Sequence, residues 1–310
     1  MKTKTIKAVL RKKFDQLTES IKDESVRNLV EKNTIITGGA IASMLLREPV
    51  NDFDLYFRDR ATAEAVANYY VTEFKTNPPT AFANRSGEVK IWIEATDERV
   101  KIVIKSAGIA SEDGGDKYKY FEGSPDEQGE NYVEEVTSAV TKADEHSSDA
   151  IDKEKPDYRP VFMSANAISL SGKVQIIVRF FGEPAVIHAN YDFLHCTCHW
   201  TSWDSEIVLP GPALECLLSK ELRYIGSKYP LSSIIRTRKF IKRDFTINAG
   251  QYLKMCFQLS QLDLTNLDVL EDQLIGVDSA YFLQLISRLK EKDPAKVDAA
   301  YLMTIIDRIF

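Results

Sequence analysis

The spacing of apolar residues divides the chain into a mixed first part and a helical second part. Residues 4–32 carry apolar side chains at mostly helical spacing among charges, which predicts one or two amphipathic helices. Residues 34–37 form a short β-branched run, residues 40–47 are good helix formers, and residues 52–57 alternate with a period of two. A strand, a helix and a second strand are therefore expected in that order.

The remaining pattern supplies further strands and then helices. An alanine-rich helix is expected over residues 62–74. Strand candidates recur at residues 89–94, 100–105, 174–180 and 192–199, and regular structure is also expected at residues 167–170. Beyond residue 212 the pattern is helical, with amphipathic stretches at residues 213–224, 251–259 and 279–289. This order predicts an α+β fold, in which a mixed sheet flanked by helices is followed by an all-α C-terminal domain.

Three regions follow from this order. Residues 1–33 are expected to pack as helices on a core domain of residues 34–209, and residues 210–310 to form the helical domain, after a Pro- and Gly-rich boundary. Residues 107–160 predict a mobile insertion in the core domain, because they are polar and can bury little apolar surface. Between Ser111 and Asp157 stand fifteen acidic residues against five lysines, so the rest of the chain is net positive although the total is −6.

Composition limits the setting. Of the 310 residues 44% are hydrophobic, enough for one large or two modest cores. No run approaches the roughly 18–20 apolar residues of a membrane span, and the first residues lack the apolar stretch of a signal peptide. The four cysteines are too few and too clustered for a disulfide framework. We therefore expect a cytoplasmic protein with reduced cysteines and no membrane partner.

The residues that indicate chemistry lie between the first two expected strands. Gly38 and Gly39 end the first strand and open a helix, so the backbone can approach a phosphate and the N–H groups of the helix's first turn can bind it. Asp52 and Asp54 are separated by one residue on the second strand, so their carboxylates point to the same face and can hold a pair of magnesium ions. Together these features predict a site for a nucleoside triphosphate (NTP).

Residues 34–58, with Gly-Gly-Ala before a short helix and Asn-Asp-Phe-Asp-Leu after it, resemble the polymerase-β-type nucleotidyltransferase superfamily, and especially its tRNA CCA-adding enzymes. The resemblance implies transfer of a nucleoside monophosphate from an NTP to a hydroxyl, with Mg²⁺ or Mn²⁺ as the metal. Gly38 and Gly39 match the glycines that position phosphate, and Asp52 and Asp54 match the metal ligands. Ala42 and Ser43 stand where CCA-adding enzymes usually have Arg-Asp, which argues against CCA addition itself; we place Ser43 among the phosphate contacts.

A third carboxylate from a later strand is usual in this superfamily, and Asp192 is the candidate for this metal ligand. The expected strand around it is similar to Phe-Asp-rich strands of viral nucleotidyltransferase-like proteins. The alternative is an aspartate that caps or terminates a turn. Just beyond it, residues 195–199 read His-Cys-Thr-Cys-His, whose spacing differs from established zinc sites. A buried cysteine pair with neighbouring histidines is the preferred interpretation of that run.

Residues 220–243 contain eight Lys or Arg, one Glu and interleaved aromatic residues. Such a tract can grip a triphosphate or an RNA backbone, although a solvated helix surface has the same composition. Arg236, Arg238 and Lys239 are the predicted nucleotide-binding residues, with Ser232 and Ser233 beside them. Residues 242–249 also resemble the Arg-Arg-Asp-Phe-Thr-Ile-Asn-Ala motif of CCA-adding enzymes, at a much later position in the chain.

The sequence thus predicts a Mg²⁺-dependent nucleotidyltransferase in which Asp52, Asp54 and Asp192 bind the metals and an RNA hydroxyl is the acceptor. Two alternatives remain at this stage. One is a catalytically inactive nucleotide-sensing or assembly protein with the same fold, which would be consistent with a viral protein. The other is a toxin-type transferase that modifies a protein. Base preference and oligomeric state have no counterpart in the sequence pattern.

Overall fold

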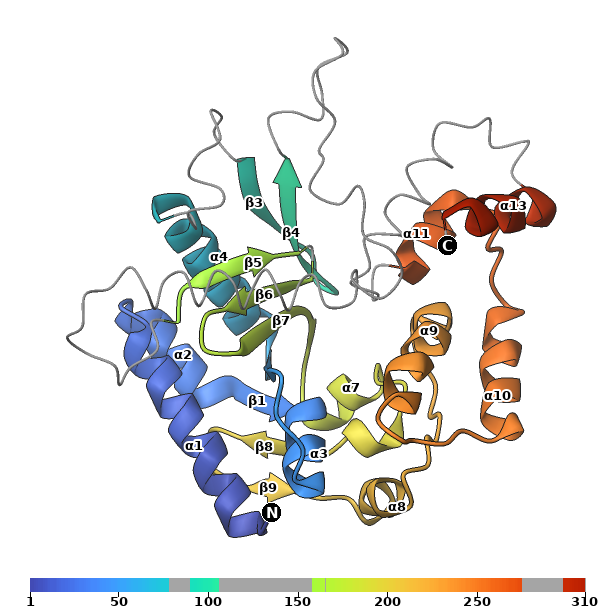
Figure 1. Ribbon diagram of the computed structural model, residues 1–310. Helices are drawn as coiled ribbons and strands as arrows, with labels where there is room; N and C mark the ends of the chain where they lie inside the picture. Colours follow the sequence, from blue (N-terminus) through green and yellow to red (C-terminus); the bar gives the residue numbers. More distant parts are fainter. Residues whose placement is uncertain (78–89, 106–157, 165, 275–297, 310) are drawn as a thin grey trace. The chain divides into compact units, whose positions relative to one another are not determined.

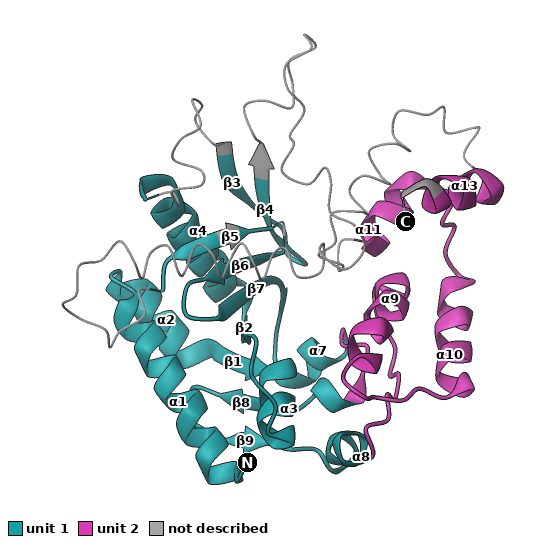
Figure 2. Ribbon diagram, viewed as in Figure 1, with its two compact units in different colours: residues 1–115, 137–189, 195–218 teal, residues 116–136, 190–194, 219–310 magenta. Residues whose placement is uncertain are grey.

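A computed structural model describes residues 1–77, 90–105, 158–164, 166–274 and 298–309 (Figure 1). The described chain forms two compact units (Figure 2). Unit 1 takes the described residues up to Ala189 together with His195–Leu218, and unit 2 takes Asn190–Leu194 and the described residues from Ser219 onward. Most of the predicted acidic insertion and the stretch at 279–289 lie outside the described residues. The expected domain boundary at residue 210 stays a prediction.

The N-terminal residues form the two predicted amphipathic helices, α1 (Thr3–Ser20) and α2 (Glu24–Asn33). Helix α1 buries Ile6, Leu10, Phe14 and Leu17, which recur every three to four residues and so share one face. Helix α2 begins after Asp23, whose carboxylate accepts hydrogen bonds from two backbone N–H groups of the first turn.

A seven-stranded mixed sheet forms the centre of unit 1. Its strand order is β5-β6-β7-β2-β1-β8-β9, in which β2 and β7 run parallel and the other neighbours are antiparallel. The strands are β1 (Thr34–Thr37), β2 (Phe53–Phe57), β5 (Pro160–Met163), β6 (Ala167–Leu170), β7 (Val174–Phe181), β8 (His199–Thr201) and β9 (Ile207–Val208). The helices of unit 1 that follow α2 are α3 (Gly39–Leu46), α4 (Arg60–Thr76), α7 (Pro184–His188) and α8 (Gly211–Ser219). Strands β3 (Lys90–Ala95) and β4 (Val100–Lys105) form a separate two-stranded sheet.

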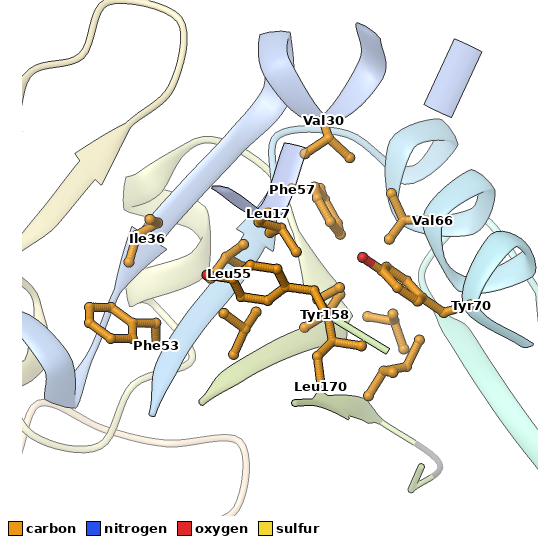
Figure 3. Close-up of a cluster of buried hydrophobic side chains, with 14 of the residues drawn as sticks. Leu17, Val30, Ile36, Phe53, Leu55, Phe57, Val66, Tyr70, Tyr158 and Leu170 are labelled. Carbon is orange, nitrogen blue, oxygen red and sulfur yellow. The ribbon is translucent and has the colours of Figure 1, made fainter. Parts of the chain in front are cut away.

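One face of the large sheet is buried under helices, and we call it the core face. Ile36, Leu55, Ile176 and Trp200 occupy matching register positions on four neighbouring strands, so their side chains lie on this face. They belong to one buried cluster with residues of α1, α2 and α4, part of which is drawn in Figure 3. The rings of Phe14 and Trp200 lie 5.3 Å apart within it. Burial of this cluster is the main apolar stabilisation of unit 1.

The predicted strand at 192–199 is wrong. The chain there is irregular with a short 3₁₀ turn (Leu194–Cys196), and only residues 199–201 join the sheet, as β8. Backbone hydrogen bonds explain the difference, because the N–H of Leu194 bonds Arg223 and the carbonyl of Asp192 bonds Ile225. These atoms pair with unit 2 residues and leave no sheet ladder for the segment.

The described part of unit 2 is mainly helical. It contains α9 (Pro230–Ile241), α10 (Ala249–Leu259), α11 (Leu267–Leu274) and α13 (Ala299–Ile309). Leu270, Leu274 and Ile305 form a small apolar cluster of their own in it. The prediction of an α+β fold with a mixed sheet, flanking helices and a helical C-terminal region is confirmed. Within the described ranges, no helix has both the length and the apolar character that crossing a membrane requires.

Candidate nucleotide and metal site

A diglycine bend joins β1 to α3. Gly38 has φ 90° and ψ −144°, a backbone conformation that side chains disfavour, and it serves as the N-cap of α3 without a side chain to cap it. Its N–H donates to the carbonyl of Cys196 at 3.2 Å. The bend therefore requires glycine at residue 38 and is tied to the segment that precedes β8.

Gly39 is the first residue of α3, and open space lies beside it. A Cβ built on Gly39 meets no described atom within 4 Å, so packing against the described residues does not require glycine there. The N–H groups of the first helical turn have no partners within the helix, and the helix dipole adds positive potential at this end. The bend thus combines anion-binding N–H groups with room for a ligand to approach them.

Asp54 lies directly across from the residue that precedes the bend. In the antiparallel register of β1 and β2, Thr37 pairs with Asp54, and paired side chains share one face of the sheet. Phe53 and Leu55 on either side of Asp54 are buried in the cluster of Figure 3, so Asp54 faces the opposite way. Asp54 is half-buried, and Asp52, which precedes β2, is exposed. A common direction of the two carboxylates stays a prediction.

Phe53 is held on the core face by a lysine. Lys13 Nζ lies 5.4 Å from the centre of the Phe53 ring and donates to the carbonyl of Gly172 at 2.5 Å. Burial, followed by the charge of Lys173, lowers the pKa of Lys13. The N–H of Phe53 also bonds the carbonyl of Lys173 at 2.9 Å. These contacts keep the residue between the two aspartates turned away from the acidic side.

A row of polar residues crosses the sheet on the face opposite the core. Ser169, Gln175, Asp54, Thr37 and His199 are register partners in turn on five adjacent strands, and we call them the polar row. Thr37 is fully buried, whereas the other four are partly exposed or half-buried. The helices cover the core face. Asp54 can therefore meet a ligand on the opposite face, which carries the polar row.

The donor set of this face fits magnesium. Mg²⁺ in phosphate-transfer sites is usually held by one or two carboxylates, with water and substrate phosphate oxygens completing the octahedron. Asp54 is half-buried on β2, Asp52 is exposed just before it, and open space lies beside Gly39. Within the described residues, no group of three or more His, Cys, Asp or Glu could hold a metal by itself. A metal at this site would therefore need ligands from the substrate.

Ser43 lies one helical turn beyond Gly39 in α3 and is 5% exposed. Its carbonyl accepts from the N–H of Glu48 at the end of the helix. The structure thus places Ser43 inside the helix that follows the bend. Its contact with phosphate stays a prediction.

Two histidines, His188 and His199, lie beside Thr37. Thr37 Oγ1 donates to the carbonyl of Cys198 at 2.8 Å and lies 2.9 Å from His188 Nε2. The rings of His188 and His199 meet edge to face with their centres 5.2 Å apart. Burial first, and the charge of His199 second, lower the pKa of His188 to about 4. Burial also lowers the pKa of His199, so both imidazoles are neutral in the folded protein near pH 7.

Asp192 and the predicted basic residues belong to unit 2. The carboxylate of Asp192 pairs with Arg236 Nε at 2.7 Å, and the side chain of Asp192 is 13% exposed. Arg238 and Lys239 are exposed on α9. The structure therefore sets Asp54 opposite Thr37, the residue before the diglycine bend, within unit 1, and it joins Asp192 to Arg236 within unit 2. The metal-binding roles of Asp52 and Asp54 stay predictions. The third-ligand role of Asp192 stays a prediction.

Two motifs in unit 2 have structural contacts. Ser232 and Ser233 are fully buried, and their hydroxyls donate to the carbonyls of Gln273 and Tyr229. In the stretch that resembles the CCA-adding motif, Phe245 is buried, and Asn248 caps α10 while donating to Glu221 at 2.7 Å. These residues shape unit 2 internally.

The cysteine and histidine run has no metal-like arrangement among described atoms. His195 and Cys198 are buried and Cys196 is half-buried. Cys196 Sγ lies 3.2 Å from His195 Nε2. Burial raises the pKa of the Cys198 thiol to about 12, so that sulfur stays protonated at neutral pH.

Sequence reasoning missed two residues of the polar side of unit 1, Gln175 and His188, and it weighed His199 only within the cysteine and histidine run. Gln175 occupies the β7 position next to Asp54, where a third carboxylate from a neighbouring strand would stand. The parallel register that places it there links distant parts of the chain and cannot be derived from local spacing. His188 follows β7 in a five-residue helix and has no motif around it.

Comparison with known proteins gives one family and a small set of structures. The sequence pattern of the Gabija anti-defense 2 family protein matches residues 8–220. No protein with a curated functional description matches the chain.

Among similar solved structures is the Thermotoga maritima CCA-adding enzyme complexed with tRNA, at 12% identity and a TM-score of 0.36 over 89% of this chain and 53% of that one. The Bacillus stearothermophilus CCA-adding enzyme in complex with CTP is 11% identical, with a TM-score of 0.36 over 88% of this chain and 51% of that one. A tRNA-processing enzyme with CTP is 10% identical, with a TM-score of 0.35 over 84% of this chain and 54% of that one. The chain thus spans about half the length of each.

The two glycines of the bend are expected to respond differently to alanine. Gly38→Ala forces a side chain into a positive-φ conformation and should lower the free energy of unfolding by about 1–3 kcal/mol. At Gly39 there is space for a methyl group and the backbone is helical. Gly39→Ala should therefore leave the free energy of unfolding unchanged or raise it by up to about 1 kcal/mol. The new methyl would occupy the phosphate approach and weaken Mg-NTP binding by about tenfold or more, which is at least about 1.4 kcal/mol. Urea denaturation measures the free energy of unfolding, and calorimetric titration measures the affinity for Mg-NTP. An unaltered NTP affinity in Gly39→Ala would show that the bend takes no part in nucleotide binding.

The lowered pKa of His188 predicts a loss of stability in acid. The unfolded chain binds a proton near pH 6.5 and the folded chain only near pH 4, so the unfolded state takes up more protons between these values. The free energy of unfolding should therefore be constant above pH 6.5 on this account and fall as the pH decreases toward 4. In His188→Gln the fall should be shallower, while both proteins share one slope above pH 7. Urea denaturation at a series of pH values checks this, and equal slopes below pH 6.5 would contradict it.

Proposed function

This chain belongs to the Gabija anti-defense 2 family, and we propose that it acts as a Mg²⁺-dependent nucleotidyltransferase whose product counteracts the Gabija defense named in the family description. The proposal assigns to it the transfer of a nucleoside monophosphate from an NTP to an acceptor hydroxyl. The observation that carries it is the pairing of Asp54 with Thr37, which sets an acidic residue across from the strand end that leads into the diglycine bend.

Each group on the polar side of unit 1 has a defined task in this reaction. The N–H groups at the start of α3 bind the triphosphate, and Gly39 leaves the space for it. Asp52 and Asp54 hold Mg²⁺ or Mn²⁺ against the phosphate oxygens. When bound, the metal supplies charge neutralisation on the phosphates and activation of the attacking hydroxyl. The protein itself contributes positioning and fixed electrostatics, which are the main sources of catalysis in phosphate transfer.

RNA is the acceptor we favour. Lys239 and Lys242 are exposed in and just after α9 of unit 2, as is Arg238, and positive charges of this kind attract a phosphate backbone. Arg236 is less exposed and paired with Asp192, which orients its guanidinium. In this assignment Arg236, Arg238 and Lys239 contact the triphosphate or the RNA acceptor.

Two other functions use the same site. A nucleotide sensor would bind Mg-NTP and transfer nothing, whereas a toxin-type transferase would place the nucleotide on a protein hydroxyl. The presence of both same-facing aspartates favours turnover over sensing, because binding alone does not need two carboxylates beside the bend. The nature of the labelled product separates RNA from protein.

The test is label transfer from each α-³²P-labelled NTP, with Mg²⁺ and either total RNA or cell lysate as the acceptor source. Label is expected in RNA, and Asp54→Asn and Asp52→Asn should lower its rate by about 100-fold or more, the effect typical for loss of one preorganised electrostatic contact. Asp97→Asn is the matched control, because Asp97 is an exposed carboxylate in the turn between β3 and β4.

Label in protein would establish the toxin-type alternative. Binding of NTP without transfer to any acceptor would establish the sensor. Equal loss of transfer in the Asp97 control and in the Asp54 variant would show that neither aspartate has a special role.

Asp192 is our proposed third metal ligand, and a pair of substitutions tests it. Asp192→Asn should raise several-fold the Mg²⁺ concentration that gives half-maximal transfer, because a carboxylate ligand is lost. Arg236→Gln removes the ion-pair partner but keeps that carboxylate, so it should raise KM for the NTP and leave the Mg²⁺ requirement unchanged. An unchanged Mg²⁺ requirement in Asp192→Asn would limit this residue to orienting Arg236. In that case Gln175, the β7 neighbour of Asp54, would be the next position to substitute.

A further inference from the structure

The hydroxyl of Thr37 is a buried junction directly before the diglycine bend. Thr37 is 0% exposed, and its Oγ1 contacts two separate segments of unit 1. One contact is the carbonyl of Cys198 at 2.8 Å, just before β8, and the other is His188 Nε2 at 2.9 Å, at the end of α7. These segments are distant from Thr37 in sequence, so the bonds fix the end of β1 from two sides.

Counting protons gives the direction of this chain of hydrogen bonds. A hydroxyl has one proton, and a carbonyl oxygen can only accept. The proton of Thr37 therefore goes to Cys198, and His188 must donate its Nε2–H to Thr37 Oγ1. This assignment requires a neutral imidazole with its proton on Nε2, which the burial of His188 favours.

The backbone of the bend is tied to the same segment. The N–H of Gly38 donates to the carbonyl of Cys196 at 3.2 Å, and Thr37 pairs with His199 in the β1–β8 ladder. Three kinds of contact thus join residues 37 and 38 to residues 196–199. A glycine at φ 90° has many other conformations available, so external contacts must select this one.

We propose that Thr37 and His188 are positioning residues that hold the diglycine bend in the conformation that presents the first N–H groups of α3 to the triphosphate. The proposal rests on the proposed function for its kinetic consequence, but the rigidity of the bend can be measured without any activity. Neither residue touches the substrate in this scheme. Their effect reaches it through the backbone of Gly38 and Gly39.

A pair of substitutions at Thr37 isolates the hydroxyl. Thr37→Val keeps the β-branched shape and removes the oxygen, whereas Thr37→Ser keeps the oxygen. Thr34→Val is the matched control, because Thr34 is also 0% exposed, lies at the other end of β1 and donates its hydroxyl to a carbonyl, that of Val30, at 2.7 Å. The two valine variants remove the same group from the same strand.

The first readout is amide hydrogen exchange of Gly38, whose N–H bonds the carbonyl of Cys196, referred to the buried amides of α4. Thr37→Val should speed exchange at the bend by tenfold or more relative to α4, while Thr34→Val and Thr37→Ser should stay near wild type. The second readout is kinetic: Thr37→Val should raise KM for the NTP by about tenfold, and Thr37→Ser should restore it.

His188→Leu and His188→Gln repeat the test from the other partner, for the case that Thr37→Val does not fold. The leucine should loosen the bend, and glutamine, which keeps an N–H donor, should restore at least part of the protection. Unchanged exchange at Gly38 in both Thr37→Val and His188→Leu overturns the proposal. A wild-type protein that neither binds nor transfers nucleotide would refute the proposed function, and the exchange data would still decide on the bend.

Discussion

The antiparallel register of β1 with β2 is the constraint on which the rest of unit 1 depends. It sets Thr37 opposite Asp54, so the residue that leads into the diglycine bend and the acidic residue of β2 lie one strand spacing apart. A slip of one residue would turn Asp54 into the apolar core and bring Leu55 to the polar side. The buried residues Ile36, Phe53 and Leu55 prevent that slip, because each would lose its place in the core. The core thus determines the geometry of the site.

Local pattern was sufficient for most of the fold. The β-branched run before Gly38, the alternation through Asp54 and the amphipathic N-terminal helices each specify an element from nearby residues, and all three are present. The segment after Asp192 has strand-like composition but no strand, since its backbone bonds residues 223 and 225 instead of a sheet neighbour. Competition for backbone partners is a tertiary effect that composition does not record.

The candidate site was predictable where it is local and unpredictable where it is not. The diglycine bend and the aspartate pair lie in one short stretch of sequence, and local spacing is enough to recognise both. Gln175, His188 and His199 join it through strand pairing and a hydrogen bond between residues far apart in sequence. Gln175 and His188 stand in no motif of their own, and His199 ends the His-Cys-Thr-Cys-His run. The ion pair between Asp192 and Arg236 is similarly a product of folding, in unit 2.

The parallel pairing of β2 with β7 has a consequence for biogenesis. Strand β7 follows β2 only after α4 and four other strands, and β8, which anchors the bend through Cys198 and His199, comes later still. During synthesis the diglycine and the aspartates leave the ribosome long before the strands that complete their surroundings, and such distant pairings form slowly. An emerging or truncated chain therefore carries the recognisable motif without its supports, and the candidate site is complete only when the last strands have joined the sheet.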